Sequence, residues 1–442
     1  MGLRGGIGAA ELAALIRERK TSAREAMQAH LAQIERENPR VNAIVTLAAE
    51  QALADAALAD GWQARGHALG PLHGLPVVIK DLVDTAGMRT TYGSRIFKDH
   101  VPVADAIHVA RMKQAGAIVV GKSNTPEFGA GSQTFNAVFG ATKNPHDVTK
   151  TCGGSSGGSA VALSCGMVPL ADGTDHGGSL RNPAAFCGVV GLRVSPGRVP
   201  EAVKGTTNLS VNGPMGRNVR DVALLLSVMA DAPDYRGDLT RDFKGVRVAW
   251  FKDMGGIPFE RPVLEAVNAQ RRVFEDLGCV VEEAEPDWTD VWESYDTLRA
   301  WGFANRHAEN VRKYGALVKD TIHWEVERGL RLSEADFARA NAMRAGAIER
   351  MQKFMETHEY FIAPTTQVLP FDVNLPYPME VAGVQMKSYV EWQMSCMLIS
   401  CLETPAISVP CAPMVGLQIV GRHRDEWSVL QLAHAFEGAG AV

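Results

Sequence analysis

The sequence predicts a folded α/β protein, and two observations lead to this class. Short apolar runs alternate with helical patterns through most of the chain. Of the 442 residues, 46% are hydrophobic and 21% are charged, as in an ordinary globular protein, so disorder is excluded. We expect a single domain over 1–442, with an N-terminal helical layer at about 1–65 and a core at about 70–200.

Helices are expected first along the chain. Residues 9–19 have helical periodicity, and Ser22 and Glu25 form a capping box that begins a second helix running toward Glu37. Further on, we expect helices at 105–115, 219–229 and 262–277, strands at 77–79, 116–120, 246–251, 279–283 and 360–363, a loop at 121–127, and a mostly helical stretch from 301 to 355. Residues 368–385 hold three prolines, which predicts a long loop or lid near a site.

Charge and cysteine content limit the partners and the location. Forty-five Lys and Arg against 50 Asp and Glu give a net charge of −5, which offers no general attraction for nucleic acid or an anionic membrane. The seven cysteines form no CxxC pair and no zinc-ligand spacing, which indicates reduced thiols. Because neither a signal-peptide pattern nor a run of 18 apolar residues is present, we expect a cytoplasmic protein.

Residues 116–123 match the P-loop pattern GxxxxGK[ST], but their context argues against a nucleotide site. The four residues between the glycines, Ala-Ile-Val-Val, are expected to form the strand itself. Asn-Thr-Pro follows at the point where a phosphate-binding helix would have to begin. We therefore reject this motif.

Ser156 stands in a GxSxG pattern, which is typical of the nucleophile elbow of α/β-hydrolases. An elbow needs a hydrophobic strand directly before it, whereas residues 148–153 are polar and turn-like. Asp175 and His176 are adjacent in sequence, too close for both to serve one triad with Ser156. An esterase that uses Ser156 stays an alternative.

Three other pieces of the sequence point to one site. Lys80 ends an apolar strand, Ser155 and Ser156 lie between glycine pairs, and Ser179 follows two glycines. Taken singly, a lysine at a strand end is usually a solvated charge, and a Gly/Ser cluster is usually a turn. The two glycines before Ser179 can, however, aim successive backbone N–H groups at one point beside its hydroxyl, as an oxyanion hole requires.

In combination, these motifs resemble those of the amidase signature family, and the resemblance implies that family's fold, a twisted mixed β-sheet surrounded by α-helices. It is carried by residues 74–81, 121–128, 153–159, 173–181 and 186–192, with a weaker match at 416–421. The resemblance therefore covers nearly the whole chain. The separation of 24 residues between Ser155 and Ser179 is also the family's.

The resemblance implies a Ser, cis-Ser, Lys triad: Ser179 is the nucleophile, Ser155 is the bridging hydroxyl after a cis peptide bond, and Lys80 is the base. The resemblance also implies that backbone N–H groups bind the oxyanion, those of His176, Gly177, Gly178 and Ser179. It further implies that the site is supported by hydrogen bonds from Ser156, Asp175 and Arg181. No role is implied for the imidazole side chain of His176. A lysine that accepts a proton near pH 7 must have a pKa below its usual value of about 10, which burial behind an apolar strand would achieve.

The activity that the resemblance implies is hydrolysis of a carboxylic amide through an acyl-enzyme, without a metal or a cofactor. The substrate would be a small molecule, and carbamates (urethanes) and esters stay open beside amides. We expect a pocket lined mainly by apolar groups from the long loops. Monomer and homodimer both stay open.

Two other classes of protein stay open. One is the catalytic subunit of a glutamine-dependent amidotransferase, although residues 191–198 differ from the Gly-Leu-Lys-Pro-Thr type of stretch common in the family. The other is a non-catalytic interaction protein, for which a buried lysine facing two serines would be costly and of no evident benefit. Residues 231–238 and 409–416 are shorter than the family's usual loops, which indicates trimmed loops or, as we favour, residues missing from the sequence.

Overall fold

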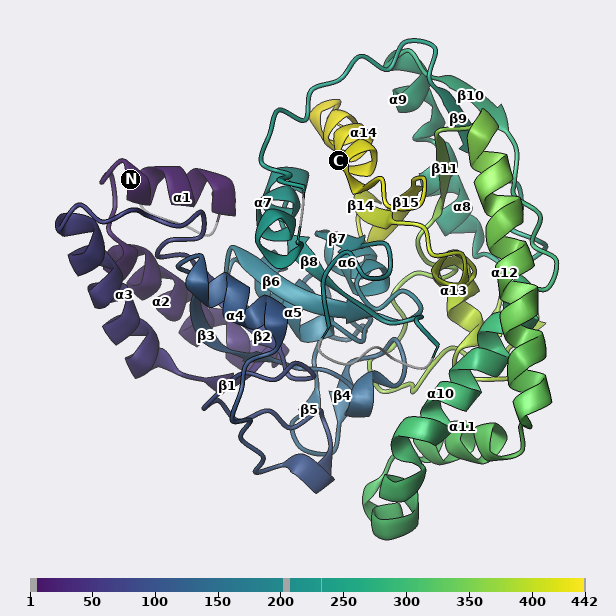
Figure 1. Cartoon of the computed structure of the whole chain (residues 1–442), viewed down its shortest axis with the longest axis horizontal. Coiled ribbons are helices and arrows are strands. Elements are labelled where there is room, and N and C mark those ends of the chain that lie inside the picture. The colour runs from purple at the N-terminus through teal and green to yellow at the C-terminus, as the bar shows by residue number, and fades with distance from the viewer. Residues whose placement is uncertain (1–5, 202–206, 232, 441–442) are drawn as a thin grey trace.

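An 11-stranded mixed sheet runs through the middle of the molecule (Figure 1). The computed structural model describes residues 6–201, 207–231 and 233–440. In spatial order the strands are β1 (Ile44–Leu47), β3 (Ile118–Ser123), β2 (Pro76–Lys80), β6 (Leu170–Asp175), β8 (Val211–Gly216), β7 (Val190–Arg193), β14 (Ala406–Ala412), β15 (Val415–Val420), β11 (Tyr360–Pro364), β9 (Arg247–Trp250) and β10 (Val280–Glu283). The expected fold class, a mixed sheet surrounded by helices, is confirmed.

Parallel and antiparallel pairings both occur in this sheet. Strand β2 pairs in parallel with β3 and β6, and β9 pairs in parallel with β10 and β11. The remaining pairings are antiparallel. Because parallel neighbours end at the same edge, the residues that end β2 and follow β6 are brought close together.

Helices cover the sheet and its ends. The N-terminal helices α1 (Ala9–Arg17), α2 (Ala23–Val41) and α3 (Ala49–Ala64) lie together at the β1 end, and α10 (Val291–Tyr314), α11 (Asp320–Leu330) and α12 (Glu334–Thr357) lie on the opposite side (Figure 1). The other helices are α4 (Ile107–Gln114), α5 (Gly157–Ser164), α6 (Arg181–Cys187), α7 (Val219–Met229), α8 (Arg261–Asn268), α9 (Arg271–Asp276), α13 (Met394–Cys401) and α14 (Glu426–Gly438). Two short ribbons, β4 (Phe135–Asn136) with β5 (Gly140–Ala141) and β12 (Glu380–Val381) with β13 (Val384–Gln385), complete the fold.

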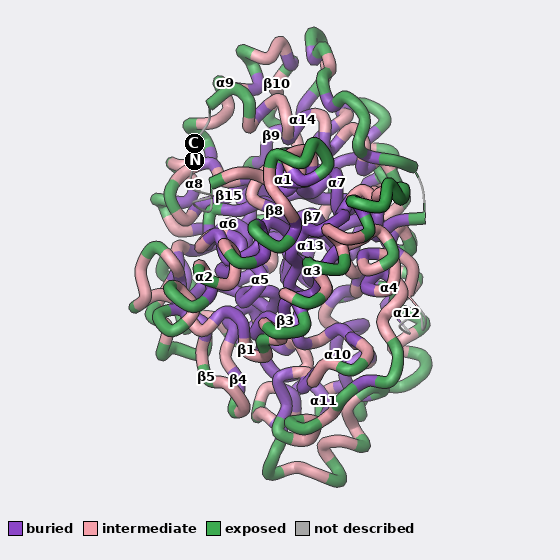
Figure 2. The backbone as a smooth tube through the Cα atoms, turned by 90° about the vertical axis from the view of Figure 1, so that its left-hand side faces the viewer, coloured by how far each residue is buried: buried purple, intermediate pink, exposed green. Residues whose placement is uncertain are grey.

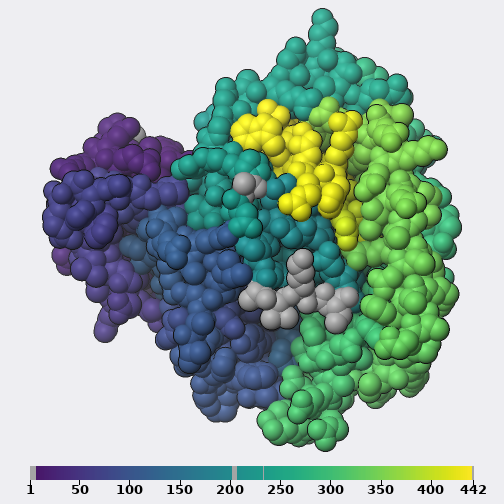
Figure 3. Space-filling view, viewed as in Figure 1, coloured from purple at the N-terminus to yellow at the C-terminus, as the bar shows by residue number. Residues whose placement is uncertain are grey.

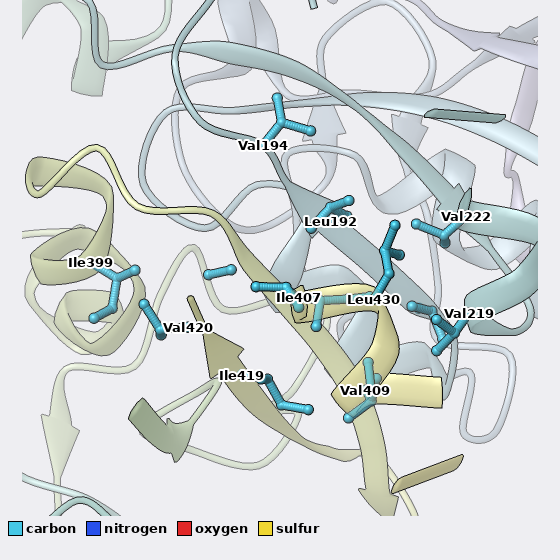
Figure 4. Close-up of a cluster of buried hydrophobic side chains, with 14 of the residues drawn as sticks. Leu192, Val194, Val219, Val222, Ile399, Ile407, Val409, Ile419, Val420 and Leu430 are labelled. Carbon is cyan, nitrogen blue, oxygen red and sulfur yellow. The ribbon is translucent and has the colours of Figure 1, made fainter. Parts of the chain in front are cut away.

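The apolar core fixes how the helices sit on the sheet. In Figure 2 the buried backbone is concentrated in the middle of the molecule, where the strands lie. Figure 4 shows one part of this core, in which side chains from β7, β14, β15, α7 and α14 meet. Burial of such side chains contributes about 25 cal/mol per Å² of apolar surface, so the core holds the strands beneath the site in a fixed register.

Most predicted elements are found, and the capping box at Ser22 and Glu25 is confirmed. The expected helix 262–277 is instead two helices, α8 and α9, and the N-terminal layer also contains a strand, β1. All seven cysteines are free, as expected. In the ranges that the structure describes, no helix is long and apolar enough to cross a membrane.

Strand β3 extends to Ser123 and therefore includes 121–123, the first part of the expected loop 121–127. Strand β1 lies so close to Gly121 that a Cβ added at this glycine would lie 2.1 Å from the carbonyl oxygen of Thr46. The glycine thus allows an extra antiparallel neighbour and a longer strand. Lys122 is buried in that strand, so the rejection of the P-loop is confirmed.

Candidate active site

Lys80 is the last residue of β2, a strand that is buried along its whole length. Its ammonium group contacts three hydroxyl groups: Nζ lies 2.7 Å from Ser155 Oγ, 3.0 Å from Ser156 Oγ and 2.8 Å from Thr174 Oγ1. The three hydroxyl oxygens can accept the three protons of a charged ammonium group. When the amine is neutral, one of these hydroxyl groups can instead donate its proton to the nitrogen lone pair. The site therefore accommodates both protonation states.

The surroundings of Lys80 favour its neutral form more than water does. Burial lowers the pKa of Lys80 to about 7, and the carboxylates of Asp172 and Asp175 oppose this shift. A comparable population of amine and ammonium at neutral pH is what a general base requires.

Ser155 and Ser156 lie between a glycine-rich turn and the start of α5. The Gly154–Ser155 peptide bond is cis, as the resemblance implies. Besides contacting Lys80, the Ser156 hydroxyl lies 3.3 Å from the backbone N–H of Thr174. The backbone N–H of Ser156 donates to the carbonyl of Ser179. No regular strand directly precedes Ser156, so the structural context of a nucleophile elbow is missing.

Ser179 follows β6 at a turn that only small residues fit. Gly178 has a φ of +113°, and a Cβ at Gly177 would lie 2.2 Å from Tyr295 Oη. Ser179 is 9% exposed, and its hydroxyl has no hydrogen-bond partner among the described residues. The structure thus brings Lys80 and Ser155 into direct contact, whereas it records no hydrogen bond between Ser155 and Ser179.

The backbone amides around Ser179 differ from the expectation at one position. The N–H of Gly178 donates to Asp175 Oδ1 at 2.8 Å and is therefore engaged by a carboxylate. Within the described ranges, the N–H groups of His176, Gly177 and Ser179 have no acceptor. Three of the four expected oxyanion donors are thus free to bind a ligand.

Asp175 is the centre of a buried ion cluster under this turn. It contacts the guanidinium groups of Arg181 and Arg193 and accepts the backbone N–H groups of Gly178 and Leu180. The two guanidinium groups hold the pKa of Asp175 well below its usual range, despite its burial. The cluster fixes the loop that carries Ser179.

We predict that Asp175→Asn destabilises the protein by about 3–5 kcal/mol, because it leaves two buried guanidinium groups without a counter-charge. Chemical denaturation of the variant and the wild type measures the difference. Asp276→Asn is the control, since the Arg272–Asp276 pair is exposed and should contribute little. A loss in Asp175→Asn no larger than in this control would contradict the prediction.

The His176 imidazole, to which the sequence assigned no role, lies beside the site. Its Nδ1 is 2.9 Å from Ser210 Oγ, and its buried Nε2 has no partner among the described residues. Burial and nearby arginines hold the pKa of His176 well below 6.5, so the ring is neutral at pH 7. A neutral ring adds no charge beside Ser179.

A cavity of about 160 Å³ lies over Ser155 and Ser179. Its other described walls include two arginines of α10, Arg299 and Arg306, together with Glu201. In Figure 3 the residues of α10 to α12 (green) form the right-hand side of this face of the molecule. The expectation of a mainly apolar pocket built from long loops is therefore met only in part: apolar side chains form part of the wall, but a helix also supplies charged side chains to it.

The predicted loop at 368–385 is irregular except for the ribbon β12–β13. Val368 and Val381 pack with Phe186 and Trp392, away from the residues that line this cavity. The loop therefore covers α6 rather than the hydroxyl of Ser179.

Four residues that contact Lys80, Asp172 or Asp175 were not predicted from the sequence. Thr174 contacts the Lys80 amine, Arg193 pairs with Asp175, and Asp172 accepts the Lys80 backbone N–H and contacts His108. A charged residue inside the apolar run before Gly173 was a usable signal for Asp172. The other three are identified only by tertiary contacts.

Comparisons with known proteins identify the family of this chain. The Amidase family model matches residues 25–430. The chain is 33% identical to an acylamidase of Rhodococcus erythropolis, over 98% of the chain and 95% of the relative. It is 34% identical to a glutamyl-tRNA(Gln) amidotransferase subunit of Geobacillus thermodenitrificans, over 97% of the chain and 96% of the relative. The crystal structure of a bacterial aryl acylamidase of the amidase signature family superimposes with a TM-score of 0.90 at 26% identity, over 99% of this chain and 96% of that one.

The fold and the family match together define a hydrolase of the amidase type. The chain belongs to the amidase signature family.

Proposed function

We propose that this protein hydrolyses a carboxylic amide C–N bond through an acyl-enzyme formed on Ser179, with Lys80 as the base and Ser155 as the bridging hydroxyl. The observation that carries the proposal is the buried Lys80 amine, 2.7 Å from Ser155 Oγ beside a cavity that Ser179 also lines. A base in contact with one serine, and a second serine at the same cavity, would form a path for a proton when the two serine hydroxyls come into contact.

In the proposed first step, Ser179 Oγ attacks the carbonyl carbon while its proton passes through Ser155 to the neutral amine of Lys80. The resulting oxyanion accepts hydrogen bonds from the free backbone N–H groups of His176, Gly177 and Ser179. As the tetrahedral intermediate collapses, the proton returns through Ser155 to the leaving nitrogen. Water then attacks the acyl-enzyme by the same route and releases the acid.

Carbamates and esters are further candidate substrates, because Ser179 can attack their carbonyl carbon in the same way. The polar and charged walls of the cavity, which include Arg306 and Glu201, favour a substrate with polar groups close to the scissile bond. The small cavity volume favours a small molecule.

The alternative is one catalytic component of a glutamine-dependent amidotransferase. It is favoured by the relatives described as glutamyl-tRNA(Gln) amidotransferase subunits, which match as closely as the acylamidase does. Such a component would depend on partner chains for its reaction. Turnover of simple amides by the isolated chain would argue against it.

Intact-mass spectrometry after treatment with a serine-directed phosphonylating reagent tests the proposal. We expect one adduct, mapped to Ser179 by peptide analysis, because its hydroxyl is reachable from the cavity and Lys80 activates it. A panel of p-nitroanilide amides and aryl carbamates is assayed in parallel, with release of p-nitroaniline or of the aryl product as the signal.

The outcomes separate the candidates. An adduct on Ser179 together with turnover supports the amidase. No adduct and no turnover would favour the partner-dependent amidotransferase component. An adduct on Ser156 would instead favour an esterase of the nucleophile-elbow type.

A further inference from the structure

A second buried carboxylate lies directly behind Lys80. Asp172, on β6, accepts the Lys80 backbone N–H with Oδ1 at 2.7 Å. Its Oδ2 lies 2.9 Å from Nε2 of His108, on α4. Asp172 is completely buried and His108 is 1% exposed, so solvent does not screen this pair. A buried carboxylate is costly unless it is hydrogen-bonded in this way, so its presence calls for a physical reason.

The charged groups around Lys80 and Asp172 can be named element by element. They are Asp81 after β2, Lys122 on β3, His108 on α4, Asp175 on β6, and Arg181 and Arg193, which pair with Asp175. Helix α5, which packs on β2, β3 and β6, carries no ionisable side chain besides hydroxyls. Of the two carboxylates that act on Lys80, Asp175 is paired with two arginines, and Asp172 exerts the larger effect.

We propose that Asp172, held in place by His108, is a positioning residue that sets the proton affinity of Lys80 and thereby the pH range in which the enzyme works. The inference rests on the proposed function, in which Lys80 is the base. It assigns to the Asp172–His108 pair an electrostatic role in addition to its hydrogen bonds.

The physical reason is a balance between burial and charge. Burial favours the neutral amine, and the negative charge of Asp172 favours the ammonium. Without that charge, Lys80 would become a weaker base and would take up the proton from Ser155 less readily. A base is most effective when its pKa lies near the working pH, and Asp172 keeps Lys80 in that range.

Asp172→Asn tests the proposal, because it removes the charge and keeps the shape. The Asn oxygen can still accept the Lys80 N–H, and its NH₂ group can donate to an unprotonated His108 Nε2. We expect the acidic limb of the kcat/KM profile to move to lower pH by at least about one unit. If Asp172 only supports the fold, activity falls at every pH and the limb keeps its position.

Variants of His108 give a second, independent test. His108→Gln keeps a donor to Asp172, so the acidic limb of the kcat/KM profile should stay at its wild-type pH. His108→Leu removes the donor that holds the Asp172 carboxylate in place, so the acidic limb should move in the same direction as in Asp172→Asn, but less far. Asp221→Asn is the matched control: Asp221 is also a buried carboxylate that accepts a backbone N–H, that of Ala10, and it does not act on Lys80.

A readout without turnover separates this inference from the proposed function. Lysine labelled with ¹³C at Cε is titrated by NMR in the Ser179→Ala background, and the Lys80 signal is assigned by its loss in Lys80→Met. A lowered Lys80 pKa in Asp172→Asn without any enzyme turnover would support the electrostatic role and count against the proposed activity. An active wild type in which neither the NMR titration nor the limb moves in Asp172→Asn would overturn the inference. If Asp172→Asn does not fold, the same comparison in His108→Leu decides.

Discussion

Ser179→Ala should lower kcat/KM by at least about 10⁴-fold, because it removes the hydroxyl that is proposed to form the acyl-enzyme. The substitution removes one oxygen atom from a side chain whose hydroxyl has no hydrogen-bond partner among the described residues. It should therefore leave the fold intact, and circular dichroism and thermal unfolding check this. Turnover of the best substrate from the p-nitroanilide and carbamate panel is the measurement.

Ser156→Ala is the matched control for this experiment. Ser156 contacts Lys80 at 3.0 Å and lies 3.3 Å from the backbone N–H of Thr174, so its loss disturbs the base without removing the nucleophile. We expect a loss of about 10- to 100-fold, in the range of a lost hydrogen bond to a charged group. Equal losses in the two variants would leave the nucleophile undecided, and the phosphonyl adduct would then have to decide it.

Lys80→Met should lower kcat/KM by about 10²- to 10⁴-fold, the usual contribution of a general base. In the wild type, Lys80 must be neutral to accept a proton, and burial holds its pKa at about 7. Activity should therefore fall about tenfold per pH unit below that value and level off above it. The residual activity of Lys80→Met should lack this limb, because no group titrates in its place.

Profiles of kcat/KM between about pH 5 and pH 9 measure both effects. Lys122→Met is the control for loss of a buried lysine: burial lowers the pKa of Lys122 to about 8, but its amine contacts Val83 and Thr85 rather than the serines. That variant should keep the limb near pH 7. A limb that persists in Lys80→Met would falsify the assignment of Lys80 as the base.

The sequence by itself determined the features that depend on local pattern. The apolar run before Lys80 predicts a buried strand, and the Ser22–Glu25 capping box predicts the start of α2, because both follow from interactions between residues close in the chain. The roles proposed for Lys80, Ser155 and Ser179, and the cis bond before Ser155, came from the family resemblance rather than from periodicity or spacing.

Tertiary structure decided what depends on residues far apart in the chain. The charge of Asp172 acts on Lys80 only because β6 pairs in parallel with β2, and Arg193 reaches Asp175 only because β7 lies two places further along the sheet. The two arginines in the cavity wall likewise depend on where α10 packs. Local patterns fix which segments become strands and helices. The pKa of Lys80 and the donors left free for an oxyanion depend on burial and on long-range contacts, which no short stretch of sequence contains.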